Sequence, residues 1–135
     1  MVEEIQKFTK LTFIIHFIIG IAFTALFWVP GITLPLLGIT LTVDTQFLSL
    51  SVGAIFAGLT IGSLLGIFAK EWKEVRIVVI TGIVYLLALP VISIISFMVF
   101  DPMMGVSMIV MTIIIWLLYL LSFLQQEDKL KPLLK

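Results

Sequence analysis

Four long apolar stretches, separated by shorter segments, make up most of the chain. They cover residues 11–29, 47–69, 75–100 and 104–124, and their only charged side chain is Arg76, at the start of the third. A helix needs about 20 mainly apolar residues to cross the hydrocarbon core of a bilayer. Because the backbone must satisfy its own polar groups in lipid, runs of this length predict four transmembrane α-helices that form one bundle.

The basic residues fall on one side of this pattern. All 8 Lys and Arg residues lie before the first stretch, at the junction of the second and third, or after the fourth. They are Lys7, Lys10, Lys70, Lys73, Arg76, Lys129, Lys131 and Lys135. The two other loops contain none, so the excess of basic residues in cytoplasmic loops predicts that both termini are cytoplasmic.

Composition supports a membrane protein and bounds its size. Hydrophobic residues make up 61% of the 135 positions, against about 45–50% in soluble domains, and the mean hydropathy is +1.30. A chain this apolar cannot cover itself with polar surface, so the lipid bilayer is its expected partner. The length predicts a single domain over residues 1–135.

Charge and residue usage exclude several kinds of chemistry. The formal net charge is zero, which provides no field to attract nucleic acid. The absence of Cys excludes disulfides and thiolate metal sites. Only one His is present, whereas a structural metal site usually needs four ligands. We therefore expect no metal, no cofactor and no nucleic-acid partner.

The loop over residues 30–46 is apolar but too short and broken to span. Pro30, Gly31, Pro35 and Gly38 interrupt it. Two interpretations stay open, a segment lying in the outer interface or over the bundle mouth, and a re-entrant segment, which would need protein or water around its irregular backbone. Asp44 precedes the second stretch and is expected to cap its helix.

Small residues recur every four positions in the second stretch, at Ala54, Gly58, Gly62 and Gly66. Such spacing lets two helix backbones approach closely in a membrane. The stripe predicts a helix-packing seam, either with a neighbouring helix of the same chain or with another protomer. Within the chain, the expected partner is a polar and small face of the first stretch, formed by Thr12, His16, Gly20, Thr24 and Trp28.

His16 is the only His, and it lies inside the first stretch. Intramembrane ionisable groups are candidates for function, and imidazole can carry protons near neutral pH. The structural interpretation is a neutral ring bonded to a neighbouring hydroxyl or carbonyl. Thr24, Tyr85 and Ser93 complete a candidate polar intramembrane site. The fourth stretch presents one polar and aromatic face, either for packing or for lining an apolar pocket, at Thr112, Trp116, Tyr119 and Phe123.

The segment 28–45 (WVPGITLPLLGITLTVDT) and the following SVGAIFAGL at 51–59 resemble a pattern in small prokaryotic membrane proteins of the DoxX-like group. The resemblance implies four spans, a Pro-containing outer turn, an acid before the second helix and a prokaryotic cell membrane. Members often carry an Arg just ahead of the second-helix Gly, where this chain has Leu50 and Ser51. The group shares no single activity, so the resemblance implies a bundle rather than a function.

Three hypotheses for function follow. The first is a non-enzymatic accessory or assembly subunit that acts by helix–helix contact. The second is an oligomeric channel or carrier for a small neutral or apolar solute. The third, an enzyme on a lipid or quinone with His16 or Tyr85 as proton donor, lacks the orienting partner that general acid catalysis needs. We therefore expect no enzyme.

Overall fold

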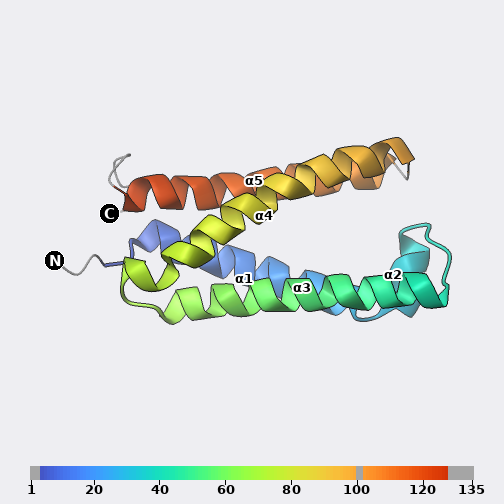
Figure 1. Cartoon of the computed structure of the whole chain (residues 1–135), viewed down its shortest axis with the longest axis horizontal. Helices are drawn as coiled ribbons and strands as arrows, with labels where there is room; N and C mark the ends of the chain where they lie inside the picture. Colours follow the sequence, from blue (N-terminus) through green and yellow to red (C-terminus); the bar gives the residue numbers. More distant parts are fainter. Residues whose placement is uncertain (1–3, 100–101, 128–135) are drawn as a thin grey trace.

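The computed structural model describes residues 4–99 and 102–127, and the regular structure in these residues is helical (Figure 1). The 5 helices, in chain order, are α1 (Lys7–Phe27), α2 (Pro30–Leu36), α3 (Val43–Phe68), α4 (Trp72–Val99) and α5 (Pro102–Gln126). The all-α prediction is confirmed. The predicted second span begins four residues too late, and the predicted outer loop contains the short helix α2.

Three helical segments in the described residues are long and apolar enough to cross a membrane. They are Lys7–Phe27, Val43–Phe68 and Ile109–Gln126. Each is at least 18 residues long, close to the length that the hydrocarbon core requires. This finding indicates a membrane protein with transmembrane helices.

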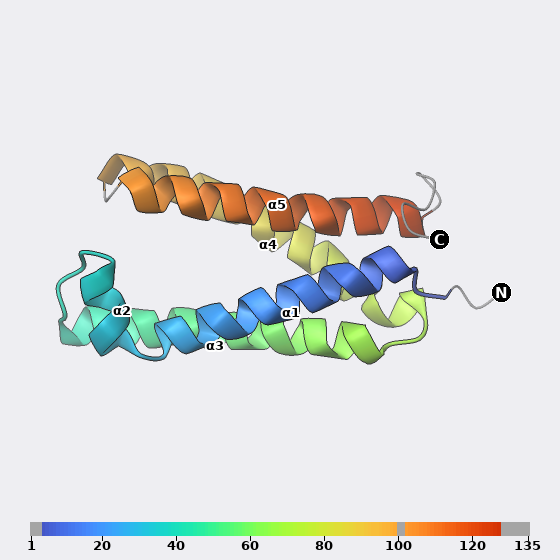
Figure 2. The same cartoon turned by 180° about the vertical axis from the view of Figure 1, so that it is seen from behind.

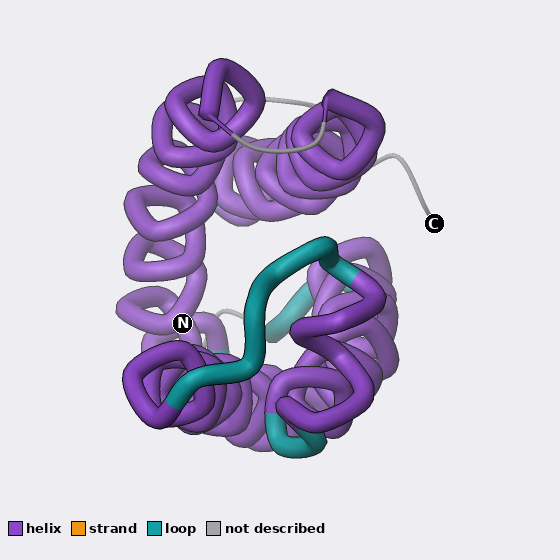
Figure 3. Tube along the Cα trace, turned by 90° about the vertical axis from the view of Figure 1, so that its right-hand side faces the viewer, coloured by secondary structure: helices purple, strands orange, loops and turns teal. Residues whose placement is uncertain are grey.

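The long helices form two hairpins, α1 with α3 and α4 with α5, which pack along their lengths. The hairpins contact each other through α1 with α5 and α3 with α4, over fewer residues. Figures 1 and 2 show the hairpins close together near the start of α1 and the end of α5, and apart near α2. The view along the helices in Figure 3 shows the same separation.

Side-chain amides hold the hairpins together at the end where α1 starts and α5 finishes. The Gln126 amide accepts a bond from Gln6 N at 3.1 Å and donates to the carbonyl of Glu4 at 2.8 Å. Ile5 N donates to the carbonyl of Lys70 at 3.2 Å. We call this end, built from the 4–6, 70–72 and 125–127 segments, the clamp end. It brings together parts of all three segments that the basic residues predict to be cytoplasmic.

At the opposite end, α2 packs against α1 and α3. Thr33 and Leu34 are buried, and the Thr33 hydroxyl donates to the carbonyl of Leu26. Gly38 has a φ of 68°, a left-handed conformation that glycine adopts without steric cost. The apolar segment is therefore folded against the ends of the first hairpin.

The cap of α3 differs from the prediction. Thr42 is the N-cap, and its hydroxyl accepts from Thr45 N at 3.2 Å while Thr45 Oγ1 accepts from Thr42 N at 2.8 Å. This reciprocal capping box satisfies two backbone donors at once. Asp44 lies inside the first turn, where the helix dipole favours its charge, so the assignment of Asp44 as the cap was wrong.

Candidate functional site

The face of α3 that meets α1 is polar and small. Gly20 lies against Thr60, because a Cβ at Gly20 would overlap Oγ1 of Thr60 and come within 3.1 Å of its Cβ. At the clamp end, a Cβ at Gly66 would lie 2.7 Å from three ring atoms of Phe13. The buried residues of α3 are Ser49, Gly53, Thr60, Ser63 and Gly66. They lie mostly three, four or seven residues apart, as on a helix face that follows a partner.

The predicted small-residue seam is therefore not the α1–α3 interface. Only Gly66 of that stripe packs against α1. A Cβ at Gly62 would meet Val78 of α4 at 3.5 Å, and a Cβ at Gly58 would meet nothing within 4 Å. Ala54 is exposed. A four-residue spacing advances about 40° around the helix at each step, so the stripe winds away from α1.

The predicted face of α1 divides between two neighbours. Trp28 covers Gly53 of α3, whereas the Thr12 hydroxyl lies 2.8 Å from Ser122 Oγ on α5. Thr24 Oγ1 is buried and has no hydrogen-bond partner in the described residues. This face of α1 thus connects the two hairpins as well as the helices within the first.

His16 lies where α1, α3 and α5 meet. Its Nδ1 is 2.6 Å from the hydroxyl of Tyr119 and 2.7 Å from Oγ of Ser63, and the two hydroxyls are 3.3 Å apart. His16 is 7% exposed, Tyr119 is 1% exposed and Ser63 is 0% exposed. We call His16, Ser63 and Tyr119 the polar node. Its contacts agree with the structural interpretation of His16, a ring bonded to neighbouring hydroxyls.

The contact distances in the polar node show that Nδ1 of His16 is hydrogen-bonded. O–H donors bond at about 2.5–3.0 Å, whereas N–H donors to oxygen bond at about 2.7–3.2 Å. The 2.6 Å contact from Tyr119 therefore fits a phenolic O–H that donates to a bare Nδ1. A neutral imidazole with a bare Nδ1 carries its proton on Nε2. The 2.7 Å contact with Ser63 also fits an N–H donor, so Nδ1 is hydrogen-bonded in either tautomer of the ring.

This arrangement differs from a nucleophilic triad. In a Ser-His-Asp set, the hydroxyl bonds one ring nitrogen and an acid orients the other. Here Ser63 and Tyr119 both contact Nδ1. The Ser63 hydroxyl also lies 3.2 Å from the carbonyl of Leu59, to which it can donate. The polar node is built to hold the ring in place rather than to activate a nucleophile.

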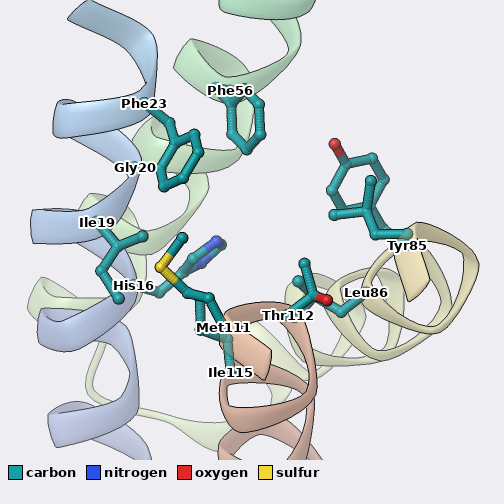
Figure 4. Close-up of a pocket in the computed structure, with 11 residues that line it drawn as sticks. His16, Ile19, Gly20, Phe23, Phe56, Tyr85, Leu86, Met111, Thr112 and Ile115 are labelled. Atoms are coloured by element: carbon teal, nitrogen blue, oxygen red, sulfur yellow. The ribbon is translucent and has the colours of Figure 1, made fainter. Parts of the chain in front are cut away.

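Two cavities border the polar node. The first, of about 30 Å³, lies between the hairpins and includes side chains of all four long helices; we call it the inter-hairpin cavity. Figure 4 shows His16 beside Met111 at this cavity, with Phe23 and Phe56 on the neighbouring wall. The lining residues are His16, Ile19, Gly20, Phe23, Phe56, Tyr85, Leu86, Leu89, Met111, Thr112 and Ile115.

The second cavity, of about 210 Å³, lies mainly between α3 and α4; we call it the α3–α4 cavity. Its lining residues are His16, Gly58, Leu59, Gly62, Ile77, Val78, Thr81, Gly82 and Tyr119. Gly58 and Gly62 of the predicted seam therefore line this hollow, and a Cβ at Gly62 would also contact Val78 of α4. Among the described residues, His16 alone borders both cavities.

The candidate polar site is brought together only in part. Tyr85 lines the inter-hairpin cavity with His16, whereas Thr24 lines neither cavity. The side chain of Ser93 lies outside the described residues. Ser63 was missed; the available signal was the run of hydroxyls at Ser49, Thr60 and Ser63 along one apolar helix. Tyr119 was recognised only as a member of an aromatic face.

No group of three or more His, Cys, Asp or Glu residues in the described part of the chain could hold a metal ion. Comparisons with protein-family models, curated proteins and solved structures found no match. The resemblance to the DoxX-like group therefore stays a prediction.

Proposed function

We propose that the protein is a four-span protein of a prokaryotic cell membrane with both termini in the cytoplasm. The fourth span would be α4, which is 28 residues long and has no charged residue after Arg76. The clamp end carries Lys70, Lys73 and Arg76, which supports placing it on the cytoplasmic side. Labelling of single cysteines at Lys70 and Gly38 with an impermeant reagent tests this orientation. If the reagent labelled the cysteine at position 70 in intact cells, this orientation would be contradicted.

We infer that this protein acts as a channel or carrier for a small neutral or apolar solute. The observation that carries this proposal is the position of His16, which borders cavities on two sides of one side chain. A solute moving along the bundle would pass from one cavity to the other by displacing that ring. The polar node would thus act as the barrier between them.

The lining of the cavities supports a neutral solute. The side chains that border them are apolar, aromatic or hydroxyl-bearing, apart from His16. An ion in such surroundings would lose its hydration with no opposite charge to offset the cost. The hydroxyls and the imidazole can instead bond a neutral polar group. Conduction of glycerol-sized neutral molecules fits this lining better than conduction of ions.

A vesicle-swelling assay tests the proposal. We expect vesicles that contain the protein to swell faster in glycerol than empty vesicles. His16→Ala should raise the rate further, because it removes the wall shared by the two cavities. Ile55→Leu is the matched control, since Ile55 is 53% exposed on α3 and lines neither cavity. Swelling no faster than that of empty vesicles, in glycerol, water or ion gradients, would contradict the proposal.

The second candidate function is an accessory or assembly subunit, and one observation favours it. Ala54 and Gly58 lie on an exposed part of α3, where a Cβ at Gly58 would meet nothing within 4 Å. Small residues on an outward face let the backbone of a second helix approach closely. The occupant would be a helix of another protomer or of a membrane-protein partner.

Cysteine cross-linking tests this second candidate, because the chain contains no Cys of its own. We expect Ala54→Cys to form a disulfide-linked dimer on mild oxidation in lipid, if the partner is a second copy. Ile18→Cys is the control, since Ile18 is 62% exposed on α1. Equal cross-linking at both positions, together with recovery of this chain alone from a mild-detergent pull-down, would contradict the accessory role.

A further inference from the structure

We propose that the α3–α4 cavity is a binding site for an anionic phospholipid, with one acyl chain in the cavity and the headgroup at Lys70 and Lys73. This inference rests on the proposed four-span arrangement, which places the cavity within the membrane, and it goes beyond the proposed carrier function. Three features of the molecule support it: the volume and lining of the cavity, the direction of its opening, and the charges above that opening.

The α3–α4 cavity is large and apolar enough to hold part of a hydrocarbon chain. A dry cavity of about 150 Å³ lined by apolar side chains binds benzene. By proportion, the volume of about 210 Å³ accommodates roughly eight carbon atoms of an acyl chain. Six of the nine lining residues are glycine or aliphatic, and the Tyr119 hydroxyl on the inner wall is already bonded to His16. Hydrocarbon therefore suits this space better than water, which needs about 2–4 polar partners.

The cavity opens on the side of the bundle, between α3 and α4. Figure 1 shows α4 diverging from α3 as it leaves the clamp end. Gly58 of α3 is exposed, Ile77 of α4 is 72% exposed, and both line the cavity. In a four-span bundle this surface contacts the hydrocarbon core. An acyl chain can enter from there and restore the dispersion contacts that an empty space would lack.

A basic side chain lies above this opening, at the depth of a lipid headgroup. Lys73, Ile77 and Thr81 follow one another at four-residue spacing on α4, so they share one side of the helix. Ile77 and Thr81 line the cavity. Lys73 lies about 6 Å nearer the clamp end than Ile77, which is close to the thickness of the headgroup region. A chain in the cavity thus leaves its phosphate near Lys73.

The loop before α4 adds a second ammonium group. Lys70 is exposed and forms no ion pair within residues 4–99 and 102–127. The neighbouring carboxylate of Glu74 accepts hydrogen bonds from the backbone N–H groups of Lys70 and Glu71. Lys73 pairs with Glu71 at the surface, and exposed pairs of this kind contribute little. A phosphate can therefore attract Lys70 directly and compete with Glu71 for Lys73.

Photo-crosslinking of the full chain in nanodiscs tests the acyl-chain site. The nanodiscs consist of phosphatidylcholine with a small fraction of a phosphatidylglycerol probe that carries a diazirine within one acyl chain. Peptide mass spectrometry then maps the labelled residues. We expect more label at Leu59 and Val78, which are half-buried lining residues, than at Ile18. Ile18 is 62% exposed on α1 and lines neither cavity, so it reports ordinary contact with the bilayer.

A phosphatidylcholine probe with the same chains tests the headgroup. At equal fractions, we expect the anionic probe to label the cavity about 5-fold more, the effect of one basic residue near an anionic lipid. Lys70→Gln should remove most of this preference. Lys10→Gln is the matched control, because it removes a basic residue of α1 outside the loop before α4. Excess glycerol phosphate should not compete; competition would indicate a site for free phosphate and overturn the inference.

A variant that fills the cavity locates the site. Gly58→Leu should lower the label at Leu59 and Val78 to the level at Ile18, while Ile55→Leu on the same helix should leave it unchanged. Thermal melting in the same nanodiscs shows whether each variant is folded. The label map of the wild-type protein needs no variant, so a variant that fails to fold does not remove the test.

The outcomes separate this site from the carrier function. Equal label at Ile18 and the lining residues, equal label from the two lipid probes, or unchanged label in folded Gly58→Leu would each overturn the lipid site. Glycerol flux without preferential labelling would also overturn the site and leave the carrier function standing. Preferential labelling by the anionic probe without flux in any gradient would support the site and contradict the carrier function.

Discussion

Replacement of Gly20 by Ala provides the sharpest test of the helix packing. A Cβ at this position would overlap Oγ1 of Thr60 and lie 3.5 Å from its Cα. Thr60 cannot simply rotate away, because its hydroxyl donates to the carbonyl of Phe56 at 2.7 Å. The new methyl group must therefore push α1 and α3 apart. Overpacking of this kind costs about 1–3 kcal/mol.

Gly58→Ala is the matched control on the facing helix. A Cβ there meets nothing within 4 Å, so only the helix propensity changes. That propensity favours Ala over Gly by about 1 kcal/mol in both variants and cancels in the comparison. We expect Gly20→Ala to melt about 3–9 °C below Gly58→Ala, at roughly 3 °C per kcal/mol for a chain of this size. Thermal unfolding followed by Trp fluorescence in detergent or nanodiscs measures the difference.

A second substitution shows whether the loss of stability in Gly20→Ala arises at the contact with Thr60. Thr60→Ala removes Oγ1, so in this background Gly20→Ala should cost less than in the wild type. Contacting residues typically show coupling of about 0.5–3 kcal/mol. Equal melting temperatures for Gly20→Ala and Gly58→Ala would refute the assignment of the α1–α3 interface. Strict additivity with Thr60→Ala would show that the methyl group meets something else.

Three further predictions concern the polar contacts. Tyr119→Phe should lower the free energy of unfolding by about 0.6–1.7 kcal/mol, the range for hydrogen bonds between membrane helices, and Tyr85→Phe should change it less in the same denaturation assay. Gln126→Ala should speed hydrogen exchange at the Gln6 amide, which loses its acceptor; unchanged exchange would contradict the clamp. Backbone amides of Glu71 and Lys70 hold the pKa of Glu74 below its usual 4.5, so this carboxylate stabilises the fold above pH 4.5 and the effect is lost as the pH falls further. Glu74→Gln should therefore lower the melting temperature more at pH 7 than at pH 3, and an equal loss at both would exclude the charge as the cause.

The long helices of this protein could be predicted from its sequence because they depend on local composition. Apolar runs with almost no charge predict helices wherever they occur, since the backbone must bond to itself in an apolar medium. The three basic segments predicted which ends lie together, and the clamp end brings them together through Ile5, Lys70 and Gln126. The polar face of α1, with His16 and Gly20, was also predicted, because a 3.6-residue period places such residues on one side.

The partner of each face was decided by the tertiary structure. A stripe of small residues is equally suited to a helix contact, a cavity wall or a lipid-exposed surface. Gly66 packs against Phe13 of α1, whereas Gly58 of the same helix is exposed at the α3–α4 cavity. The contact with α1 follows a spacing near 3.5 residues through Thr60 and Ser63, since a nearly aligned helix stays beside that face. A four-residue stripe turns away from such a partner.

The contacts of the polar node depended on the tertiary structure even more than the helix contacts did. His16 is 47 residues from Ser63 and 103 from Tyr119 along the chain, and their meeting depends on how the two hairpins dock. Local sequence specified that a polar ring lies within an apolar helix, and hence that it would need a partner, because an unpaired buried donor or acceptor is costly. It did not specify which hydroxyls would meet the ring. Long-range packing chose them, and the same packing placed His16 at the border of both cavities.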